Sequence, residues 1–442
     1  MNYFCQTSSP PFLGQPQKVL GQPQKVLDQH QKVEHQKNKP QKTSTAFLIA
    51  ISLALGGCNS PEQPTNTSTQ QPATQQTNID STSIETIKIG VVVPLTGPQA
   101  HLGKEFKEGA TMAAETVNAE MATRNTLING KKIKFEIVAE DDQADPKTAT
   151  LVAQKMADQN IKGIVGHLNS GTSIPASRIY AEAGIPQISP SATAVAYTAQ
   201  GYATTFRVVA NDAHQGSVLG ESAVTRLGAK KAAVIDDRTA YGQGLADQVE
   251  KSIQAAGGAI VAREFTTDKS TDFTAILTSI KSKTPDLIFF GGMDTQAAPL
   301  IKQMRALGMT QILLVGDGGQ SAEYIRIAGD AAEGTVGSSP GLPIEQMPKG
   351  PAFVTAFTAK YGQIQNYAPY AHDAAAVLMT AMQQANSTET ETYLATLKNI
   401  QYAGVTGVIS FDSKGDIKNG AITLYQVKNG QWQVLSVVRP NP

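Results

Sequence analysis

Short apolar runs alternate with longer amphipathic stretches from about residue 87 to residue 315. The runs at 87–93, 161–165, 185–188, 232–235, 287–290 and 312–315 are rich in valine and isoleucine and have the length of buried strands. Stretches such as 103–118, which carry apolar residues at helical spacing, separate these runs. Regular alternation of strand and helix predicts an α/β fold with parallel sheets covered by helices.

The strands fall into two sets, one from residue 87 to about 211 and one from 230 to about 336. Helices are predicted near 352–360 and 372–384, and the end of the chain, 407–438, is rich in strand formers. We therefore expect two sheets, with the C-terminal part of the chain returning to both of them.

The N-terminal 45 residues do not have the pattern of a folded domain. Residues 14–20 repeat as 21–27, and 28–34 is a degenerate third copy. Two of the copies contain proline, which argues against a coiled coil. We expect this low-complexity segment to be disordered.

An apolar run at 46–57 follows Lys37, Lys39 and Lys42 and ends in the sequence LGGC at Cys58. The run is too short to span a membrane but has the length of a signal-peptide core. Its end resembles a lipoprotein cleavage box, whereas the alternative is an ordinary buried cysteine after an apolar helix. We predict that Cys58 becomes the lipid-carrying N-terminus, and that 58–84, rich in Ser, Thr, Gln and Pro, is a flexible tether.

Charge and cysteine content bear on two further properties, nucleic-acid binding and disulfide bonds. The chain has 37 basic and 37 acidic residues, a balance that gives no support to nucleic-acid binding. Cys5 and Cys58 are its two cysteines, and both precede the predicted folded part, so we expect no disulfide there. The length of 442 residues suits two or three domains.

Two hydroxyl-rich loops follow neighbouring predicted strands, at 169–173 and 189–193. We expect Pro175 in the first turn of the intervening helix and Gly184 at its end. The carboxyl ends of parallel strands form the usual ligand edge of an α/β sheet, and a helix N-terminus attracts anions. These loops therefore suit a small carboxylate, although ordinary helix capping explains the same composition.

The chain resembles the branched-chain amino-acid binding proteins of ABC importers from about residue 87 to residue 425. The resemblance rests on the order and spacing of IGVVVPLTGPQAHLG, EDDQADPKTA, GHLNSGTSIPAS, ISPSAT, AYGQGLA and FDSKGDI. It implies a type I periplasmic binding fold, with two doubly wound parallel-sheet lobes, three crossovers and a ligand in the cleft between the lobes. Many relatives carry a disulfide where Ala144 and Asn169 stand here.

Matching positions imply a ligand site. The α-carboxylate is expected at Ser170, Ser191 and Thr193, and Tyr241 is expected to close over the ligand from the second lobe. Relatives often have a glutamate at the position of Gly318, so Asp317, with Asp294 as a weaker candidate, is expected to hold the ammonium group; helix capping is the alternative role for Asp317. Leu102, Met293 and Tyr367 are expected around the ligand side chain, with His101 adjoining.

Catalytic and metal sites were weighed against this interpretation. The sequence GSSPG at 337–341 has the letters of a serine-hydrolase motif, but Pro340 lacks the N–H that the oxyanion hole needs. Glu140, Asp141 and Asp142 could form a metal site, but without a histidine or further oxygen ligands nearby the sequence favours a solvated strand end. We predict no enzyme activity, no cofactor and no metal.

The sequence predicts an extracytoplasmic lipoprotein, periplasmic or at the cell surface, that captures a free amino acid and delivers it to an ABC permease. The alternative is a ligand-sensing receptor component for amino acids, amides or urea. We expect a monomer with a signal segment at 1–57 and a tether at 58–84. Lobe 1 is expected at 85–211 plus 341–419, and lobe 2 at 212–340 plus 420–442.

Overall fold

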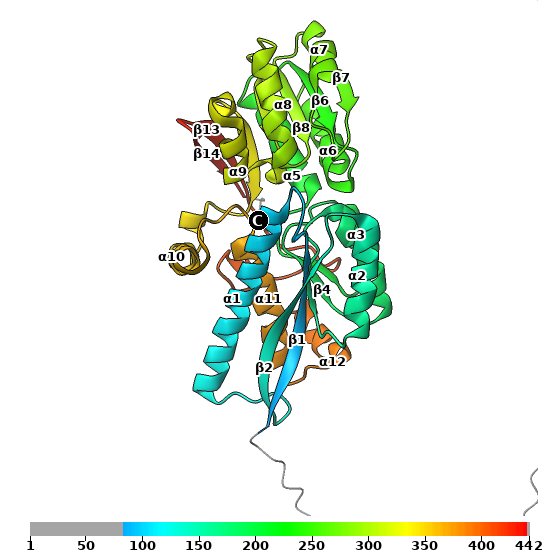
Figure 1. Ribbon diagram of the computed structural model, residues 1–442, viewed down its shortest axis with the longest axis vertical. Helices are drawn as coiled ribbons and strands as arrows, with labels where there is room; N and C mark the ends of the chain where they lie inside the picture. The colour runs from blue at the N-terminus through cyan, green and yellow to red at the C-terminus, as the bar shows by residue number, and fades with distance from the viewer. Residues whose placement is uncertain (1–82, 440–442) are drawn as a thin grey trace, which may run out of the picture. The chain divides into compact units, whose positions relative to one another are not determined.

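The computed structural model describes residues 83–439, which form two lobes, each with a sheet flanked by helices (Figure 1). The predicted repeat segment, signal segment and lipidation site at Cys58 lie outside the described residues, as does nearly all of the predicted tether. Within the described part of the chain, no helix combines the length and the apolar character needed to cross a membrane.

The first lobe contains a five-stranded parallel sheet in the order β2-β1-β3-β4-β5. Its strands are β1 (Ile84–Val93), β2 (Lys132–Asp141), β3 (Ile164–Gly166), β4 (Gln187–Ser189) and β5 (Thr205–Arg207). Val91, Val92 and Val93 are fully buried because β1 lies inside the sheet with helices over both faces. The helices of this lobe are α1 (Ala100–Arg124), α2 (Pro146–Asp158), α3 (Ser170–Glu182), α4 (Ala196–Ala199), α10 (Gly350–Tyr361), α11 (Ala368–Gln384) and α12 (Thr390–Lys398).

The second lobe contains a seven-stranded sheet in the order β14-β13-β10-β9-β8-β6-β7. Its strands are β6 (Lys231–Asp236), β7 (Ala259–Phe265), β8 (Leu287–Gly291), β9 (Ile312–Val315), β10 (Val336–Pro340), β13 (Ile422–Lys428) and β14 (Gln431–Val438). The two C-terminal strands are antiparallel, since β13 pairs with both β10 and β14 in that sense. The helices here are α5 (Asp212–Thr225), α6 (Ala240–Ala255), α7 (Thr274–Ser282), α8 (Asp294–Ala306) and α9 (Ala322–Ala328), with the 3₁₀ turns η1 (Asp317–Gly319) and η2 (Gly329–Ala332).

The chain passes between the two sheets three times: between β5 and β6, after β10, and before β13. The segment between the second and third passages contains η3 (Ile344–Gln346), α10, α11, α12 and the small ribbon β11 (Tyr402–Ala403) with β12 (Val408–Ile409). Helix α11 packs along α1 and is buried over most of its length, so this returning segment completes the core of the first lobe. The two-lobe α/β fold with three crossovers is thereby confirmed.

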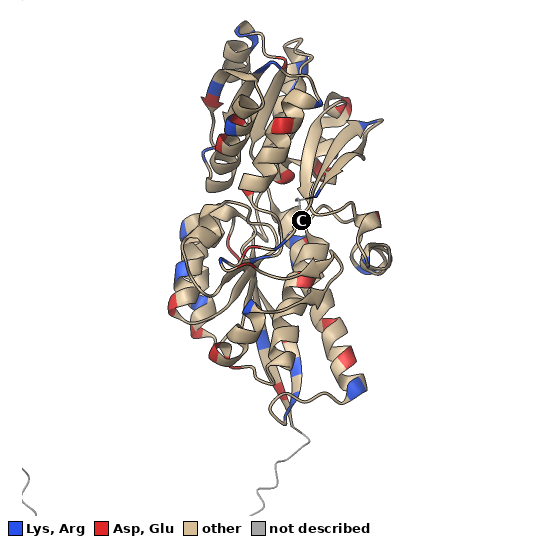
Figure 2. Ribbon diagram, turned by 180° about the vertical axis from the view of Figure 1, so that it is seen from behind, with Lys and Arg blue, Asp and Glu red and all other residues tan. Residues whose placement is uncertain are grey.

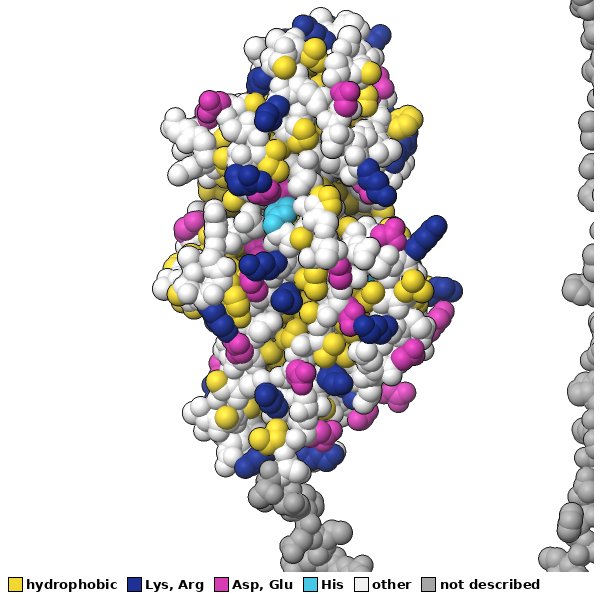
Figure 3. All heavy atoms as spheres, viewed as in Figure 1, with side chains coloured by type: hydrophobic (Ala, Val, Ile, Leu, Met, Phe, Trp, Pro, Cys, Tyr) yellow, Lys and Arg dark blue, Asp and Glu magenta, His cyan; other side chains and the backbone are white. Residues whose placement is uncertain are grey.

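Basic and acidic side chains are interspersed on both lobes (Figures 2 and 3). The faces seen there show no large area of a single charge, in agreement with the balanced composition.

Two predicted helix starts were wrong. Helix α3 begins at Ser170, so Ser170–Ser173 is its first turn and Pro175 lies inside the helix. Helix α11 begins at Ala368 rather than near His372, because Pro369 occupies a first-turn position. In both cases the helix extends up to the turn that carries predicted ligand residues.

Candidate functional site

The predicted ligand loops both lie at the carboxyl ends of strands in the first sheet. Asn169 and Ser170 follow β3 and open α3, while Ser191 and Thr193 follow β4. Because β3 and β4 pair in parallel, the two segments emerge side by side at the same sheet edge. The serine and threonine side chains there are buried, with no more than 5% of their surface exposed.

A small cavity of about 10 Å³ lies between these segments and the second lobe, so the two walls are nearly in contact here. It is lined by six of the eight predicted ligand residues together with three neighbours: Ser170, Ser191, Tyr241, Met293, Asp317, Tyr367, Leu168, Asn169 and Gly318. The other two predicted residues, Leu102 and Thr193, are not lining residues, and Leu102 packs in the core of the first lobe. The structure therefore brings most of the predicted set together, while their role in binding stays a prediction.

The hydroxyl groups at the first-lobe wall differ in their availability. The Ser170 hydroxyl oxygen accepts a hydrogen bond from the Ala194 N–H at 3.1 Å, and no described residue accepts its proton. Ser191 donates its proton to the Leu168 carbonyl at 2.8 Å. The Thr193 hydroxyl oxygen is buried without a hydrogen-bond partner in the described chain. Ser170 thus has a proton free for a ligand in the cavity, whereas the Thr193 hydroxyl lies near the Asp212 carboxylate and does not line the cavity.

Asp317 provides the second-lobe wall of the cavity. Its Oδ1 accepts hydrogen bonds from the Tyr241 hydroxyl at 3.0 Å and from Gln215 at 2.9 Å, and its Oδ2 accepts one from the Tyr367 hydroxyl at 2.8 Å. Burial raises the pKa of Asp317, and these hydrogen bonds oppose that rise. The capping alternative for Asp317 is wrong, because Ser321 caps α9 with its own hydroxyl.

The geometry also explains why an acid stands at 317 and not at 318. A Cβ atom added to Gly318 would lie 2.8 Å from the Tyr241 ring and 2.9 Å from the Met293 sulfur. The position has no room for a side chain in this arrangement, so a carboxylate must come from the preceding residue. Asp294, the weaker candidate, bonds His101 and Ser321 and does not line the cavity.

Asp212 is a residue of this region that the sequence did not point out. It is 1% exposed at the start of α5, and neither carboxylate oxygen has a hydrogen-bond partner within residues 83–439. Burial, and then repulsion from Asp317, raises its pKa to about 8. An aspartate at a helix start is usually read as a cap, but Asn211 caps α5 here, which leaves the Asp212 carboxylate free.

Asp212 is tied directly to the second ligand loop, because its N–H donates to the Thr193 carbonyl at 2.8 Å. The region thus has two buried carboxylates, Asp212 and Asp317, together with the free Ser170 hydroxyl and the helix N-terminus of the first lobe. A cationic group suits the carboxylates and an anionic group suits the hydroxyl and the helix. The arrangement is chemically complementary to a small zwitterion.

Arg207 fixes the second ligand loop, residues 189–193, through hydrogen bonds to backbone carbonyls. The side chain is fully buried, and one terminal nitrogen donates to the carbonyls of Ala192 at 2.9 Å and Ala194 at 3.0 Å. Its Nε pairs with Asp416 at 2.5 Å, and its other terminal nitrogen donates to the Thr198 hydroxyl. The carbonyls on both sides of Thr193 are therefore fixed by one guanidinium group.

His167 supports both ligand loops. Its Nδ1 lies 2.7 Å from Asp142, its Nε2 lies 3.1 Å from the Tyr180 hydroxyl, and all of its side chain is buried. Its carbonyl accepts hydrogen bonds from Ser173 and Ser189. The prediction of a solvated strand end at 140–142 was wrong for Asp142, since a histidine distant in sequence packs against it in space.

Three hydrogen-bonded contacts join the lobes beside the cavity. His101 Nε2, at the start of α1, lies 2.7 Å from Asp294 at the start of α8. Tyr367 bonds Asp317 as described, and the neighbouring Asn366 side chain donates to the Asp317 carbonyl at 3.2 Å. The lobes are therefore in contact across the cleft in this structure.

Buried Glu105 fixes the loop that carries Tyr367. It accepts hydrogen bonds at 2.7–2.8 Å from the backbone N–H groups of Gln365, Asn366 and Tyr367. Burial raises the pKa of Glu105 to about 7, and these bonds oppose the rise. Residues 365–367 are therefore anchored to α1 although they are distant from it in sequence.

No cluster of three or more histidine, cysteine or acidic side chains arranged to hold a metal ion occurs among residues 83–439.

Comparisons with known proteins bear directly on this geometry. A family model described as periplasmic binding protein matches residues 86–431 of this chain. Leu/Ile/Val-binding protein homolog 1 of Brucella abortus (strain 2308) is 35% identical over 345 residues, or 78% of this chain and 91% of that protein. The leucine-, isoleucine-, valine-, threonine- and alanine-binding protein of Pseudomonas aeruginosa is 33% identical over 347 residues, with the same coverage.

A solved structure gives a matching result. The branched-chain amino-acid transporter substrate-binding protein LivJ from Streptococcus pneumoniae, crystallised with isoleucine, has a TM-score of 0.72 and 28% identity. The match covers 80% of this chain and all of that one. This chain thus shares sequence and fold with substrate-binding components of amino-acid ABC transporters.

Proposed function

This chain belongs to the periplasmic binding protein family, whose members bind substrates and are not enzymes, and from that premise we propose that it captures a free amino acid between its lobes. The bound amino acid would be delivered to an ABC permease in the membrane, and membership of the family implies an extracytoplasmic location. The observation that carries the proposal is the zwitterion-complementary site, with the free Ser170 hydroxyl on one lobe and the Asp317 carboxylate on the other.

The proposed binding mode assigns each end of the ligand to one wall. The α-carboxylate accepts hydrogen bonds from the Ser170 hydroxyl and from N–H groups in the first turn of α3. The ammonium group lies towards Asp317, where its positive charge favours the ionised form of this buried carboxylate. The ligand side chain lies towards Met293 and Tyr367.

Closure of the lobes follows from the same contacts. Tyr241 and Asp317 come from the second lobe and Ser170 from the first, so the complete set exists only when the lobes meet. A ligand that contacts both walls favours the closed arrangement, because it binds that arrangement more tightly than an open one. We propose that a permease recognises the closed form. We propose that lobe 1 consists of residues 85–211 and 341–419 and that lobe 2 consists of residues 212–340 and 420–442. We also propose that the protein is a monomer.

A thermal-shift screen of the chain against amino acids, amides, urea and benzoate tests the ligand class. A ligand that binds the native state raises the melting temperature by mass action. We expect shifts with zwitterionic amino acids and none with benzoate, which lacks an ammonium group. Shifts with amides or urea, and none with amino acids, would refute the proposal.

Ser170→Ala is expected to weaken amino-acid binding by about 1–3 kcal/mol, the typical cost of losing a hydrogen bond to a charged group. Titration calorimetry measures the change. Ser177→Ala is the matched control, because Ser177 lies on the same helix and donates to the Ile174 carbonyl without lining the cavity. Equal affinities of the two variants would mean that the carboxylate binds elsewhere.

Amino-acid affinity is expected to depend on pH through His101. Burial lowers the pKa of His101, but the hydrogen bond and attraction to Asp294 across the cleft outweigh this, with attraction from Glu323 and Glu105, so the pKa lies above 6.5. The closed form therefore favours protonated His101, which makes affinity highest at pH values below 6.5 and lower as the pH rises through the raised pKa.

The expected loss between pH 6 and pH 8 is about two- to five-fold, since His101 is partly exposed and such pairs are weak. Calorimetry at several pH values measures it. His101→Gln should reduce this dependence to the part contributed by Glu105 and Asp212, whose pKa values are about 7 and about 8, whereas His372→Gln, which lies away from the cavity, should leave it as in wild type. An identical pH profile in wild type and His101→Gln would contradict the assignment.

We also propose the lipid anchor at Cys58 that the sequence predicts. Cys58→Ala is expected to shift the protein from the membrane fraction to the soluble fraction, because one covalent attachment would be lost. Immunoblots of fractionated cells measure the distribution. Continued retention of the variant at the membrane would count against lipidation.

A further inference from the structure

A second cavity lies beside the amino-acid site, at the edge of the contact between the lobes. It is open to the surface and has a volume of about 360 Å³, compared with about 10 Å³ for the amino-acid cavity. Gln320, Ser339 and Tyr425 line it from the second lobe, and the segment from Leu342 to Tyr370 lines it from the first. An occupant of this cavity would therefore contact both lobes.

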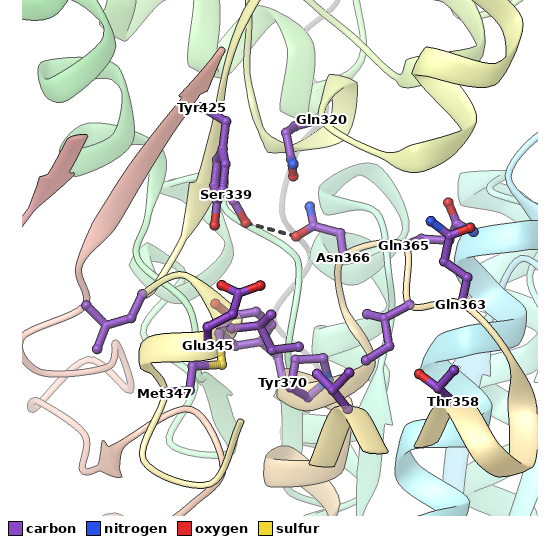
Figure 4. Close-up of a pocket in the computed structure, with 15 residues that line it drawn as sticks. Gln320, Ser339, Glu345, Met347, Thr358, Gln363, Gln365, Asn366, Tyr370 and Tyr425 are labelled. Carbon is purple, nitrogen blue, oxygen red and sulfur yellow. Dashed lines mark hydrogen bonds between the residues drawn. The ribbon is translucent and has the colours of Figure 1, made fainter. Parts of the chain in front are cut away.

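Polar and apolar side chains occupy different parts of the cavity lining. Figure 4 shows Tyr425, Ser339, Gln320 and Asn366 grouped at one end, with the Glu345 carboxylate directed towards them. The apolar part of the lining consists of Leu342, Ile344, Met347, Val354, Ile364 and Pro369. The cavity is thus amphipathic, with a polar end and an apolar wall.

The polar groups favour a hydrogen-bond donor that carries positive charge. Glu345 is the one charged side chain among the lining residues, and no lysine or arginine is among them. Gln365, also a lining residue, has a buried side-chain oxygen with no hydrogen-bond partner in the described chain. Asn366 Oδ1 is already occupied by the Ser339 hydroxyl at 2.9 Å. Gln365 lies apart from Glu345 in Figure 4, so the single negative charge of Glu345 is the feature that is complementary to an ammonium group.

The two cavities share the loop at 365–367. Asn366 lines the larger cavity and donates to the Asp317 carbonyl, while the next residue, Tyr367, lines the amino-acid cavity and donates to the Asp317 carboxylate. A molecule that packs against Asn366 and bridges the lobes favours the same lobe arrangement that places Tyr367 on Asp317.

We propose that this cavity is a second small-molecule site, specific for an amine with an apolar body, and that its occupancy strengthens binding at the amino-acid site. The ammonium group lies at the end marked by Glu345, and the apolar body packs on the wall formed by Ile344, Val354 and Ile364. The coupling is reciprocal, since any ligand that favours the closed lobes raises affinity for the other.

The test uses the whole chain and three probes of similar shape: phenethylamine, 3-phenylpropan-1-ol and 3-phenylpropionate. Titration calorimetry without an amino acid is expected to rank the amine first, the alcohol second and the carboxylate last. Glu345→Gln should weaken phenethylamine about five-fold, as expected for one partly exposed charge pair. Val354→Trp, which fills the apolar wall, should abolish its binding.

Glu391→Gln is the matched control, because it removes an exposed acidic side chain of α12 outside the cavity. It should bind phenethylamine as wild type does. Binding that survives both Glu345→Gln and Val354→Trp would overturn the site, as would no binding at about 10 mM, where ligands with a Kd near 1 mM saturate. Equal affinity for all three probes would overturn the assignment to amines.

Coupling is measured as the leucine affinity with and without saturating phenethylamine, and it rests on the proposed function. We expect the amine to tighten leucine binding about five-fold, within the usual range of coupling between sites. Competition between the two ligands would place the amine in the amino-acid site and overturn the proposal. Failure of every amino acid in the thermal-shift screen to bind would instead refute the proposed function, since amine binding is measured without an amino acid.

Discussion

Replacing Arg207 with methionine is expected to lower the free energy of unfolding by about 3–5 kcal/mol, because it leaves partners of a buried cation unpaired. The side chain is fully buried and serves the Ala192 and Ala194 carbonyls, the Thr198 hydroxyl and Asp416. Methionine fills much of the volume but makes none of these hydrogen bonds. The second ligand loop would lose its main support.

Urea denaturation followed by circular dichroism measures the loss. Arg178→Met is the matched control in the same lobe, since Arg178 is exposed and pairs with Glu182 at 3.7 Å within one helix. Removing that surface pair should change stability by no more than about 0.5 kcal/mol. If the two variants were equally stable, Arg207 would not have the structural role assigned to it.

Asp317→Asn is expected to weaken amino-acid binding by about 2–5 kcal/mol, the usual cost of removing one partner of a buried, hydrogen-bonded charge pair. Asparagine keeps the size of the side chain: its one oxygen can accept from Tyr241, and its amide group can donate to the Tyr367 hydroxyl, so the fold of η1 should be retained. What the variant lacks is the negative charge proposed to lie against the ammonium group.

Calorimetry with the best amino acid from the thermal-shift screen measures this effect. Asp330→Asn is the control, because Asp330 is an exposed acid of the same lobe. An unperturbed melting temperature in both variants would show that the folded state is intact. Wild-type affinity in Asp317→Asn would move the ammonium site elsewhere, with Asp212→Asn the next variant to measure.

The parallel parts of both sheets could be predicted because their strands are short apolar runs separated by helix-length amphipathic stretches. The antiparallel pairing of β13 could not, since the direction of a strand depends on which strand it meets. The start of α3 was also missed. Because proline is common in the first turn of a helix, Pro175 was predicted there. The helix in fact begins at Ser170, one turn earlier in the sequence.

The candidate site shows a similar limit. Ser170, Tyr241 and Asp317 were predicted from their positions in the family resemblance, and the structure places them around one cavity. Asp212 was missed because an acid after Asn211 looks like a helix start, and only the fold reveals that both of its oxygens are unsatisfied. The pair of Asp142 and His167 was missed because its members are 25 positions apart. Contacts between distant segments leave no periodic signal in the sequence.

The order in which the sheets acquire their strands has a consequence for biogenesis. All strands of the first sheet lie between Ile84 and Arg207. In the second sheet, β10 pairs with β13, which begins only at Ile422 and is followed by β14. Until those last strands emerge from the ribosome or the export channel, one side of β10 is an open edge able to pair with another chain. Chaperone protection during synthesis and translocation is therefore most needed for the second lobe, and a nonsense mutation just before β13 would produce an aggregation-prone polypeptide.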